Sequence, residues 1–395
     1  MIFNIPIEFF LFAATLLCVA LFHNQTLQVA VIGMATIALY KLGFTDFSLG
    51  KHLAHEWVTL ANLLGLLLGF ALLADHFEKS EIPAILPQYL PDDWKGGFCL
   101  LVIIFVMSAV LDNIAAAMIG GTMAASLYQR RVHIGYLAAI VAASNAGGAG
   151  SVVGDTTTTM MWISGVSPLA VMEAALGSAV ALCIFGTIAA KQQHAYQPIQ
   201  KDAVAGAHVD KARLSIAALI LLSAIAANIL GNLCAPQLLS VIPIMGLAVC
   251  GMVLLTALWR KPAWGLLPGA FKGSIFLLSL VLCASMMPVD QLPKASWQTA
   301  LGLGFVSAVF DNIPLTALAL RQGGYDWGFL AYAVGFGGSM IWFGSSAGVA
   351  LSNMYPEAKS VGAWLKAGWG VVLGYVVGFF VMLAVLGWHS SAITG

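Results

Sequence analysis

The chain has 395 residues, of which 60% are hydrophobic and only 9% are charged, whereas an ordinary soluble domain has roughly 25% charged residues. A mean hydropathy of +0.92 excludes a soluble globular protein and an intrinsically disordered one. Seventeen basic residues balance seventeen acidic ones, so we expect no nucleic-acid partner. Since a membrane-spanning helix needs about 20 apolar residues, the composition predicts an all-α polytopic membrane protein surrounded by lipid.

Apolar runs between charged or Pro- and Gly-rich breaks predict ten membrane spans. In chain order the spans are 7–22, 27–44, 57–74, 132–164, 167–190, 212–233, 238–259, 268–288, 326–352 and 361–388. No basic region precedes the first span, so we expect it to be retained and not cleaved as a signal sequence. Two further apolar segments, 97–128 and 296–320, are interrupted by polar residues in the middle. Such segments are typical of re-entrant helical hairpins whose tips are buried in protein.

Basic residues predict the orientation, because short cytoplasmic connections are enriched in Lys and Arg. Four of the seventeen, Lys41, Lys51, Lys294 and Arg321, fall on one side of the predicted topology and the other thirteen on the opposite side. The richer side is therefore expected to face the cytoplasm, with both chain ends outside it, in the inner membrane of a bacterial cell. The two hairpins then enter the membrane from opposite faces.

Two parts of the sequence repeat each other. The motif Ser108-Ala-Val-Leu-Asp-Asn-Ile114 recurs 199 residues later as Ser307-Ala-Val-Phe-Asp-Asn-Ile313. Each hairpin is followed by a span with a glycine pair and, seven residues after the first glycine, a glycine that precedes a polar residue. Glycine lets a helix unwind, although the alternative is that these glycines only allow close helix packing, as Gly65-x-x-x-Gly69 is expected to do. We predict two inverted repeats, each with a re-entrant hairpin and a broken transmembrane helix, the pattern of a secondary transporter.

Three acidic residues, Asp112, Asp155 and Asp311, lie deep in the predicted membrane segments, where no Lys or Arg is comparably deep. Ionisable side chains in a membrane are expensive and indicate function by default. Burial disfavours a charged carboxylate, so a proton and a metal ion become competing ligands for it. The surrounding hydroxyl, amide and carboxylate oxygens suit a hard cation such as sodium, unless the threonines only bond backbone carbonyls. The predicted ion-binding residues are Asp112, Asn113, Asn145, Asp155, Thr156, Thr157, Asp311, Asn312, Thr316, Ser345 and Ser346, with sodium held by the three aspartates.

Segment 145–163, Asn145-Ala-Gly-Gly-Ala-Gly-Ser-Val-Val-Gly-Asp-Thr-Thr-Thr-Thr-Met-Met-Trp-Ile163, resembles the signature of NhaD-type sodium/proton antiporters. Asp311-Asn-Ile-Pro-Leu-Thr316 and Gly337-Gly-Ser-Met-Ile-Trp-Phe-Gly-Ser-Ser-Ala-Gly-Val349 resemble its counterpart in the second half. More broadly, the layout is similar to the ion transporter superfamily, which includes dicarboxylate, citrate and arsenite carriers. The three alanines that follow Asp112-Asn-Ile114 depart from the family, which has hydroxyl residues there.

The resemblance implies a homodimer in which a transport part moves like an elevator against a scaffold. Scaffold spans are expected in 1–74 and 212–288, the two repeats in 75–190 and 289–395, and a cytoplasmic loop in 191–211. The implied ion-site positions are Asp112, Asn113, Asp155, Thr157, Asp311, Asn312 and Ser345. No cofactor is expected besides the transported ions.

The leading functional prediction is exchange of sodium or lithium for protons, because competition for one carboxylate from opposite faces of a membrane produces exchange. The alternative is a sodium-coupled di- or tricarboxylate carrier, whose anionic substrate would lie beside Asp112 and Asp311, where like charges repel. An intramembrane aspartyl protease is disfavoured because each Asp of the repeated motif precedes an Asn at a hairpin tip and no protease motif is present. An arsenite carrier is disfavoured for lack of thiol features. We therefore expect a transporter and not an enzyme.

Overall fold

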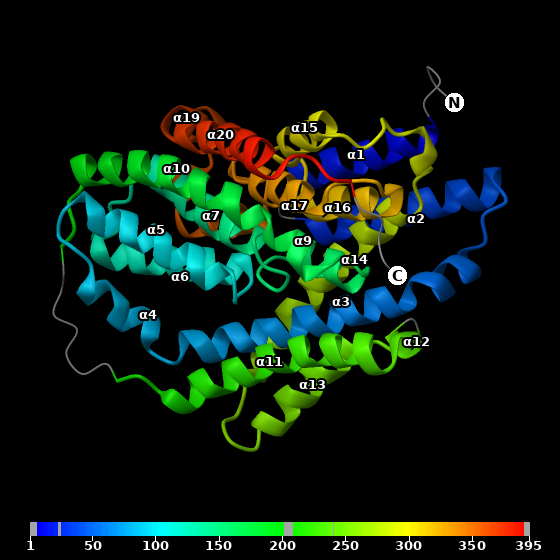
Figure 1. The fold of residues 1–395 in the computed structure, drawn as a ribbon, viewed down its shortest axis with the longest axis horizontal. Coiled ribbons are helices and arrows are strands. Elements are labelled where there is room, and N and C mark those ends of the chain that lie inside the picture. Colours follow the sequence, from blue (N-terminus) through cyan, green and yellow to red (C-terminus); the bar gives the residue numbers. More distant parts are fainter. Residues whose placement is uncertain (1–5, 23–24, 201–207, 240, 391–395) are drawn as a thin grey trace. The chain divides into compact units, whose positions relative to one another are not determined.

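The computed structural model describes residues 6–22, 25–200, 208–239 and 241–390. Throughout these ranges the chain is helical or irregular and contains no strand, as the composition predicts. The α-helices (Figure 1) are α1 (Ile7–Leu21), α2 (Thr26–Phe44), α3 (Leu49–Glu78), α4 (Ile82–Ile85), α5 (Trp94–Ser108), α6 (Asn113–Leu127), α7 (Ile134–Ala149), α8 (Thr156–Ile163), α9 (Pro168–Met172), α10 (Ala174–Tyr196), α11 (Lys211–Cys234), α12 (Pro236–Leu239), α13 (Ile244–Thr256), α14 (Leu267–Ser285), α15 (Trp297–Ser307), α16 (Asn312–Gln322), α17 (Trp327–Leu330), α18 (Ser346–Met354), α19 (Val361–Ala367) and α20 (Trp369–Leu386).

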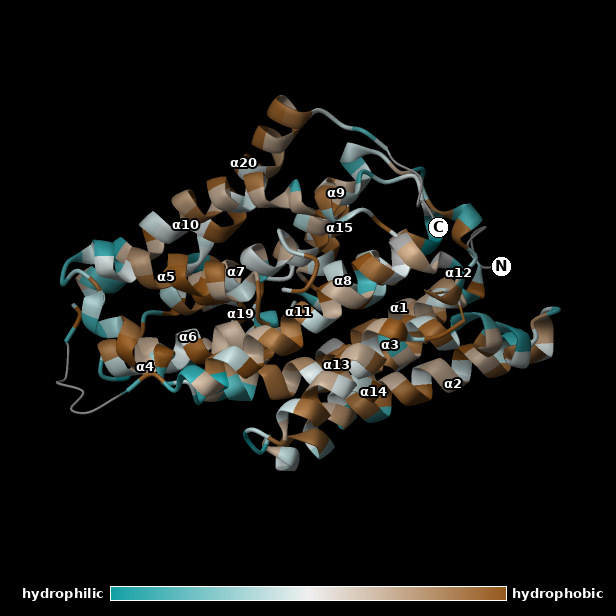
Figure 2. Ribbon diagram, turned by 60° about the horizontal axis from the view of Figure 1, so that its bottom comes forward, coloured by the Kyte–Doolittle hydropathy of each residue, from teal (hydrophilic) through white to brown (hydrophobic). Residues whose placement is uncertain are grey.

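Six helical segments of the described chain are long and apolar enough to cross a membrane. These are Thr26–Phe44, Leu49–Glu78, Pro168–Tyr196, Lys211–Gly231, Trp264–Ser285 and Trp369–Leu386. Shorter apolar helices accompany them, and hydrophobic residues dominate helices such as α5, α10 and α20, whereas hydrophilic residues gather at connections (Figure 2). Because so many helices are apolar on most of their surface, the chain has the character of a multi-pass integral membrane protein.

The chain divides into two compact units. The first unit consists of 1–77, 211–293 and 317–322, and the second unit consists of 78–210, 294–316 and 323–395. Each unit is therefore assembled from segments that lie far apart in the sequence. The assignment of a scaffold role and a transport role to these segments remains a prediction.

In the first unit, small residues bring α3 and α13 into backbone contact. A Cβ atom at Gly65 would lie 2.7 Å from the Cα of Gly246, and one at Gly69 would lie 2.0 Å from Val249. The Asn62 side chain accepts a hydrogen bond from the Gly246 amide at 3.0 Å. The close packing that the Gly65-x-x-x-Gly69 spacing predicts is therefore confirmed.

In the second unit, α7 is the central helix and is buried at every position from Gly135 to Ala149. It packs against α5, α6, α10 and α19, and in Figure 1 it lies between α5 and α10. Ala and Gly at nine of its sixteen positions allow neighbours to approach on all sides. An asparagine in such a helix is surrounded by protein, so its amide needs partners there.

Both spans with glycine pairs are interrupted. The predicted span 132–164 forms α7 and α8, with residues 150–155 outside either helix. The predicted span 326–352 forms α17, a π-helix (Ala331–Phe336) and α18, with irregular backbone before Ser346. Each interruption leaves helix ends and free backbone groups in the interior of the unit.

The two polar-interrupted apolar segments each form a pair of helices. Segment 97–128 becomes α5 and α6, which pack against each other, and segment 296–320 becomes α15 and α16. Asp112 and Asp311 come directly before the second helix of each pair. Re-entry of these pairs into the membrane and their inverted relation remain predictions.

Several predicted boundaries are wrong. Helix α3 has 30 residues and not the 18 of span 57–74, because the helix continues through polar residues that hydropathy excludes. Helix α13 has only 13 residues, so 238–259 is not one continuous span. The expected loop 191–211 begins later, since α10 continues to Tyr196. Residues 201–207 of that loop, and the chain ends 1–5 and 391–395, lie outside the described residues.

Candidate functional site

A buried polar cluster in the second unit contains most of the predicted ion-binding residues. We define it as the side chains joined to one another by hydrogen bonds, namely Asn113, Asn145, Asp155, Asn312, Ser339 and Ser345. Each of these side chains is at most 5% exposed. The cluster draws on four segments, α6, α7 with its following loop, the start of α16, and the loop that leads into α18.

Asp155 is the acidic centre of the cluster and is only 2% exposed. Its Oδ1 accepts a hydrogen bond from the Thr157 amide at 2.9 Å, which caps α8. Its Oδ2 accepts from Asn113 Nδ2 at 3.3 Å and from Asn312 Nδ2 at 3.4 Å. Three N–H donors therefore surround a carboxylate that has no cationic side chain among its partners.

Asn145 connects the two halves of the sequence within the cluster. Its Oδ1 accepts from Asn113 Nδ2 at 3.0 Å, while its own Nδ2 donates to Ser339 Oγ at 2.9 Å and to Ser345 Oγ at 3.0 Å. One amide thus bonds to three neighbours, and a hydrophobic residue of the same size would break all three hydrogen bonds.

Four helices begin around this site, and a side chain from the predicted set accepts a backbone N–H at each start. Asp112 accepts from Ile114 at 3.1 Å, Asp311 accepts from Ile313 at 3.0 Å, and Ser345 accepts from Gly348 at 3.2 Å. Asp155 does the same at α8. Helix N-termini carry partial positive charge, so the fold stabilises carboxylates here without Lys or Arg.

Asp112 and Asp311 are half-buried and do not hydrogen-bond to Asp155, although their charges lie close enough to act on it. Ser346 donates its hydroxyl to Asp311 Oδ2 at 3.3 Å. Within the described ranges, no ion pair joins any of the three aspartates to a basic residue. In the same ranges, no three His, Cys, Asp or Glu side chains lie close enough together for a metal site. The three aspartates therefore do not converge on one point.

The three predicted threonines differ in their surroundings. The Thr157 hydroxyl is buried next to the Asp155 carboxylate and makes no hydrogen bond of good geometry. Thr316 donates to the Asn312 carbonyl at 3.0 Å, the local bond that a helix offers to threonine. Thr156 is buried but is not one of the Asp155 donors. Thr157 is thus the hydroxyl with an unused oxygen beside the carboxylate.

Corresponding serine and glycine contacts hold the broken span in each half of the chain. Ser108 donates its hydroxyl to the Ser144 carbonyl, and Ser307 donates to the Val334 carbonyl. A Cβ at Gly147 would lie 2.1 Å from the Phe105 carbonyl oxygen, and one at Gly337 would lie 2.3 Å from that of Gly304. The first glycine of each pair therefore permits close packing, which is the alternative role considered for these glycines. The helices also end nearby, two residues after Gly147 and at Gly337.

Three residues that shape the cluster were not in the predicted set, namely Ser339 of the cluster itself, Trp364 and Gly335. Trp364 of α19, which is 1% exposed, donates its Nε1 to the Ser339 carbonyl at 3.2 Å. Gly335 faces the carboxylate, since a Cβ there would lie 3.7 Å from Asp155 Oδ2. Ser339 directly follows a predicted glycine pair, a signal that could have found it, whereas Trp364 belongs to no repeated motif.

Comparison with known proteins finds two plant relatives. "Sodium/proton antiporter 1" of Arabidopsis thaliana is 26% identical over 376 residues, which are 84% of this chain and 61% of the relative. "Sodium/proton antiporter 2" of the same plant is 25% identical over 375 residues, 83% of each chain. The chain therefore spans less than two thirds of the first relative. No protein-family model matches the chain.

Proposed function

We propose that this protein exchanges sodium or lithium ions for protons across a membrane, with Asp155 as the group for which the two ions compete. The observation that carries the proposal is a buried carboxylate surrounded by three N–H donors and the Thr157 hydroxyl, with no basic partner among its hydrogen bonds. An unpaired buried charge is costly, so this carboxylate needs a proton or a bound cation. The names of the two relatives support the same activity.

The amides around Asp155 can serve both forms of the site. An ionised carboxylate only accepts hydrogen bonds, and the N–H groups of Asn113, Asn312 and Thr157 fit that form. If either asparagine amide turns by half a rotation, its oxygen replaces its N–H group and becomes a ligand for sodium or an acceptor for a carboxyl proton. The same few side chains can therefore bind one cation or the other in turn.

Further ligands for sodium are available next to Asp155. The Thr157 hydroxyl has an unused oxygen, and the end of α7 presents carbonyls with partial negative charge. Oxygen ligands of these kinds suit hard cations. Asp112 and Asp311, each at the start of a helix, add negative charge that attracts a cation toward the cluster. Asn145, Thr156, Thr316, Ser345 and Ser346 support this arrangement.

We further propose that the second unit is the transport part and moves as an elevator, in a homodimer of NhaD type whose first unit is the scaffold. The polar cluster lies wholly in the second unit, and the matching serine and glycine contacts in its two halves support two inverted repeats. The basic side of the protein faces the cytoplasm in this arrangement. The cluster contains no basic side chain to hold an organic anion, so nothing favours the carboxylate carrier.

Reconstitution tests the proposed function directly. Purified protein is placed in proteoliposomes with an internal pH dye, and sodium chloride, lithium chloride or potassium chloride is added outside without any organic anion. Sodium and lithium should drive proton release from the lumen, and potassium should not. Sodium uptake that appears only when citrate or succinate is added would refute the proposal.

A matched pair of variants assigns the activity to the carboxylate. Asp155→Asn keeps the size of the side chain and its ability to cap α8, but it removes the group that binds the proton, so exchange should be lost. Asp93→Asn makes the same change at an exposed cap, that of α5, and should exchange like the unaltered protein. Equal exchange in both variants would show that Asp155 is not the shared site.

A further inference from the structure

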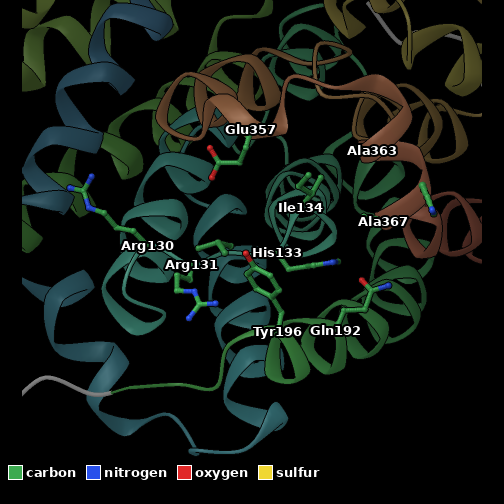
Figure 3. A pocket seen from close by; sticks show the side chains of 11 residues that line it. Arg130, Arg131, His133, Ile134, Gln192, Tyr196, Glu357, Ala363 and Ala367 are labelled. Carbon is green, nitrogen blue, oxygen red and sulfur yellow. The ribbon is translucent and has the colours of Figure 1, made fainter.

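Helix α7 has a different environment at each of its ends. A cavity of about 650 Å³ surrounds its start (Figure 3), and the polar cluster lies near its end. In Figure 3, Arg130 and Arg131 lie on one side of Ile134 at the start of the helix, and Ala363 and Ala367 lie on the other. The side chains that line the cavity from these two sides do not converge on one point, unlike those of the polar cluster. A group that selects the bound ion is therefore expected at the end of α7 and not at its start.

One wall of the Asp155 site lacks a side chain. Gly335 is buried in the π-helix of the second broken span, which packs against α7 and α8, and π-helices are rare and gather at functional sites. A Cβ at Gly335 would lie 3.7 Å from Asp155 Oδ2 and 3.0 Å from the Cβ of Ala149. The Gly335 backbone therefore faces the same carboxylate oxygen that accepts from Asn113 and Asn312.

The corresponding position in the first half of the chain has a side chain. Asn145 and Gly335 each lie two residues before a glycine pair. The Asn145 amide extends to two serines of the second half, Ser339 at 2.9 Å and Ser345 at 3.0 Å. Counted from the glycine pairs, those serines correspond to the two residues that Gly335 faces in the first half. The two positions thus have matching neighbours, but an amide fills the space at one and glycine adds no side chain at the other.

The π-helix is held by contacts on both sides of Gly335. On one side the Ser307 hydroxyl donates to the Val334 carbonyl at 2.8 Å. On the other side the Phe336 ring lies 5.9 Å from the Tyr375 ring, centroid to centroid. Because a packed interior deforms little, a side chain added at Gly335 would approach the carboxylate and would not be carried away by a shift of the backbone.

The missing side chain matters for a cation bound at Asp155 Oδ2. Selectivity between hard cations depends on the size of the site and on the number of its ligands, and sodium is larger than lithium. A methyl group at position 335 would touch Oδ2 at van der Waals distance and would offer no ligand. It would exclude water and other ligands from part of the space around the carboxylate, so the larger ion should lose more than the smaller one.

We propose that Gly335 determines the size of the alkali cation that the site accepts, because its missing side chain leaves Asp155 Oδ2 open to sodium on this side. This inference rests on the proposed exchange of sodium or lithium for protons. Gly335 is a wall of the site and not a ligand. A methyl group there should therefore change the preference between the two ions in favour of lithium and should not abolish exchange.

A double variant tests the proposal by moving one methyl group across the contact. Gly335→Ala alone would press its new Cβ against the Cβ of Ala149 at 3.0 Å. Ala149→Gly with Gly335→Ala removes that contact, and the two next nearest atoms, Asp155 Oδ2 and the Cα at position 149, both lie at 3.7 Å. The sodium affinity of the double variant should fall at least about tenfold relative to its lithium affinity, the discrimination that one methyl group provides in a closed pocket. Ala149→Gly alone should keep the ratio of the unaltered protein.

Two measurements give the ratio of sodium affinity to lithium affinity. Titrations of proton flux with each ion in the same proteoliposomes give a ratio that does not depend on how much of the protein is active. The rise in Tm with sodium chloride or lithium chloride, followed by tryptophan fluorescence, gives the ratio without transport. Gly302→Ala, whose new Cβ meets nothing within 4 Å, is the control for replacing a glycine and should match the unaltered protein in both measurements.

The outcomes separate this inference from the proposed function. An unaltered protein without sodium- or lithium-driven proton flux would overturn both. Flux in the unaltered protein, with the same preference between the ions in the double variant, would overturn only the role of Gly335. Equal loss of sodium and lithium binding in the double variant would also overturn that role, because a wall that limits ion size weakens the larger ion more.

Discussion

Asn113 and Asn312 occupy corresponding positions 199 residues apart in the repeated motif, and both donate their side-chain amides to Oδ2 of Asp155, at 3.3 Å and 3.4 Å. One carboxylate oxygen therefore receives a ligand from each half of the chain. Because the two amides approach the same atom, neither half forms the site alone.

Replacing either amide should weaken cation binding. Asn312→Ala removes one donor or oxygen ligand, and a hydrogen bond to a charged group is worth about 1.5–3 kcal/mol, so the apparent sodium affinity of exchange should fall roughly tenfold or more. Asn113→Ala should lower the apparent sodium affinity further, since Asn113 also bonds Asn145. Sodium titration of proton flux in proteoliposomes measures both.

The control for these asparagines is Asn353→Ala. Asn353 is exposed and bonds Lys359 outside the cluster, so its loss should leave sodium affinity unchanged. Unchanged sodium affinity in both Asn113→Ala and Asn312→Ala would show that these amides are not part of the ion site.

Gly337→Ala should destabilise the protein. Its new Cβ would lie 2.3 Å from the Gly304 carbonyl oxygen, a backbone atom that cannot move aside cheaply, and overpacking of this kind costs about 1–3 kcal/mol. Gly302→Ala is the matched control in the same unit, because a Cβ there meets nothing within 4 Å. Since alanine favours helix over glycine, Gly302→Ala should raise Tm slightly. A Gly337→Ala protein as stable as the control would contradict the observed packing.

Trp364→Phe should weaken both stability and sodium affinity. The substitution removes the hydrogen bond to the Ser339 carbonyl, at a cost of about 1 kcal/mol, and loosens the serine that Asn145 holds. Trp369→Phe alters an exposed tryptophan and should change neither. Thermal unfolding and sodium titration, measured on both variants, separate the effect of position from that of lost aromatic area.

Parts of the site were predictable because the sequence contains them as local patterns. The repeated Asp-Asn pair and the glycine-rich segment before Asp155 marked Asn113, Asp155 and Asn312 without any structure. A pattern along the chain does not, however, specify which side chains meet. The bonds of Asn145 to Ser339 and Ser345 depend on packing between segments roughly 200 residues apart, and the bond of Trp364 to Ser339 joins positions 25 residues apart that no repeated motif links.

The predicted spans were wrong where the length of the apolar run differs from the length of the helix. Helix α3 extends through His52 and Glu56, which hydropathy assigns to a connection, because tertiary contacts such as the Glu56–Arg321 ion pair at 3.7 Å accommodate the polar residues. Conversely, the apolar run 238–259 contains Pro243, which ends any continuous helix there. Apolar composition alone indicates burial but not where a helix begins.

The pH dependence of sodium affinity tests the central claim most directly. Proton flux driven by sodium alone is measured in proteoliposomes between about pH 6 and pH 9, and the apparent sodium affinity is determined at each pH. If a proton and sodium compete for Asp155, the affinity should weaken as pH falls, by up to about tenfold per pH unit for each competing proton once the pH is below the pKa of the site. A sodium affinity that stays constant over this range, or exchange that persists in Asp155→Asn, would contradict competition for one carboxylate.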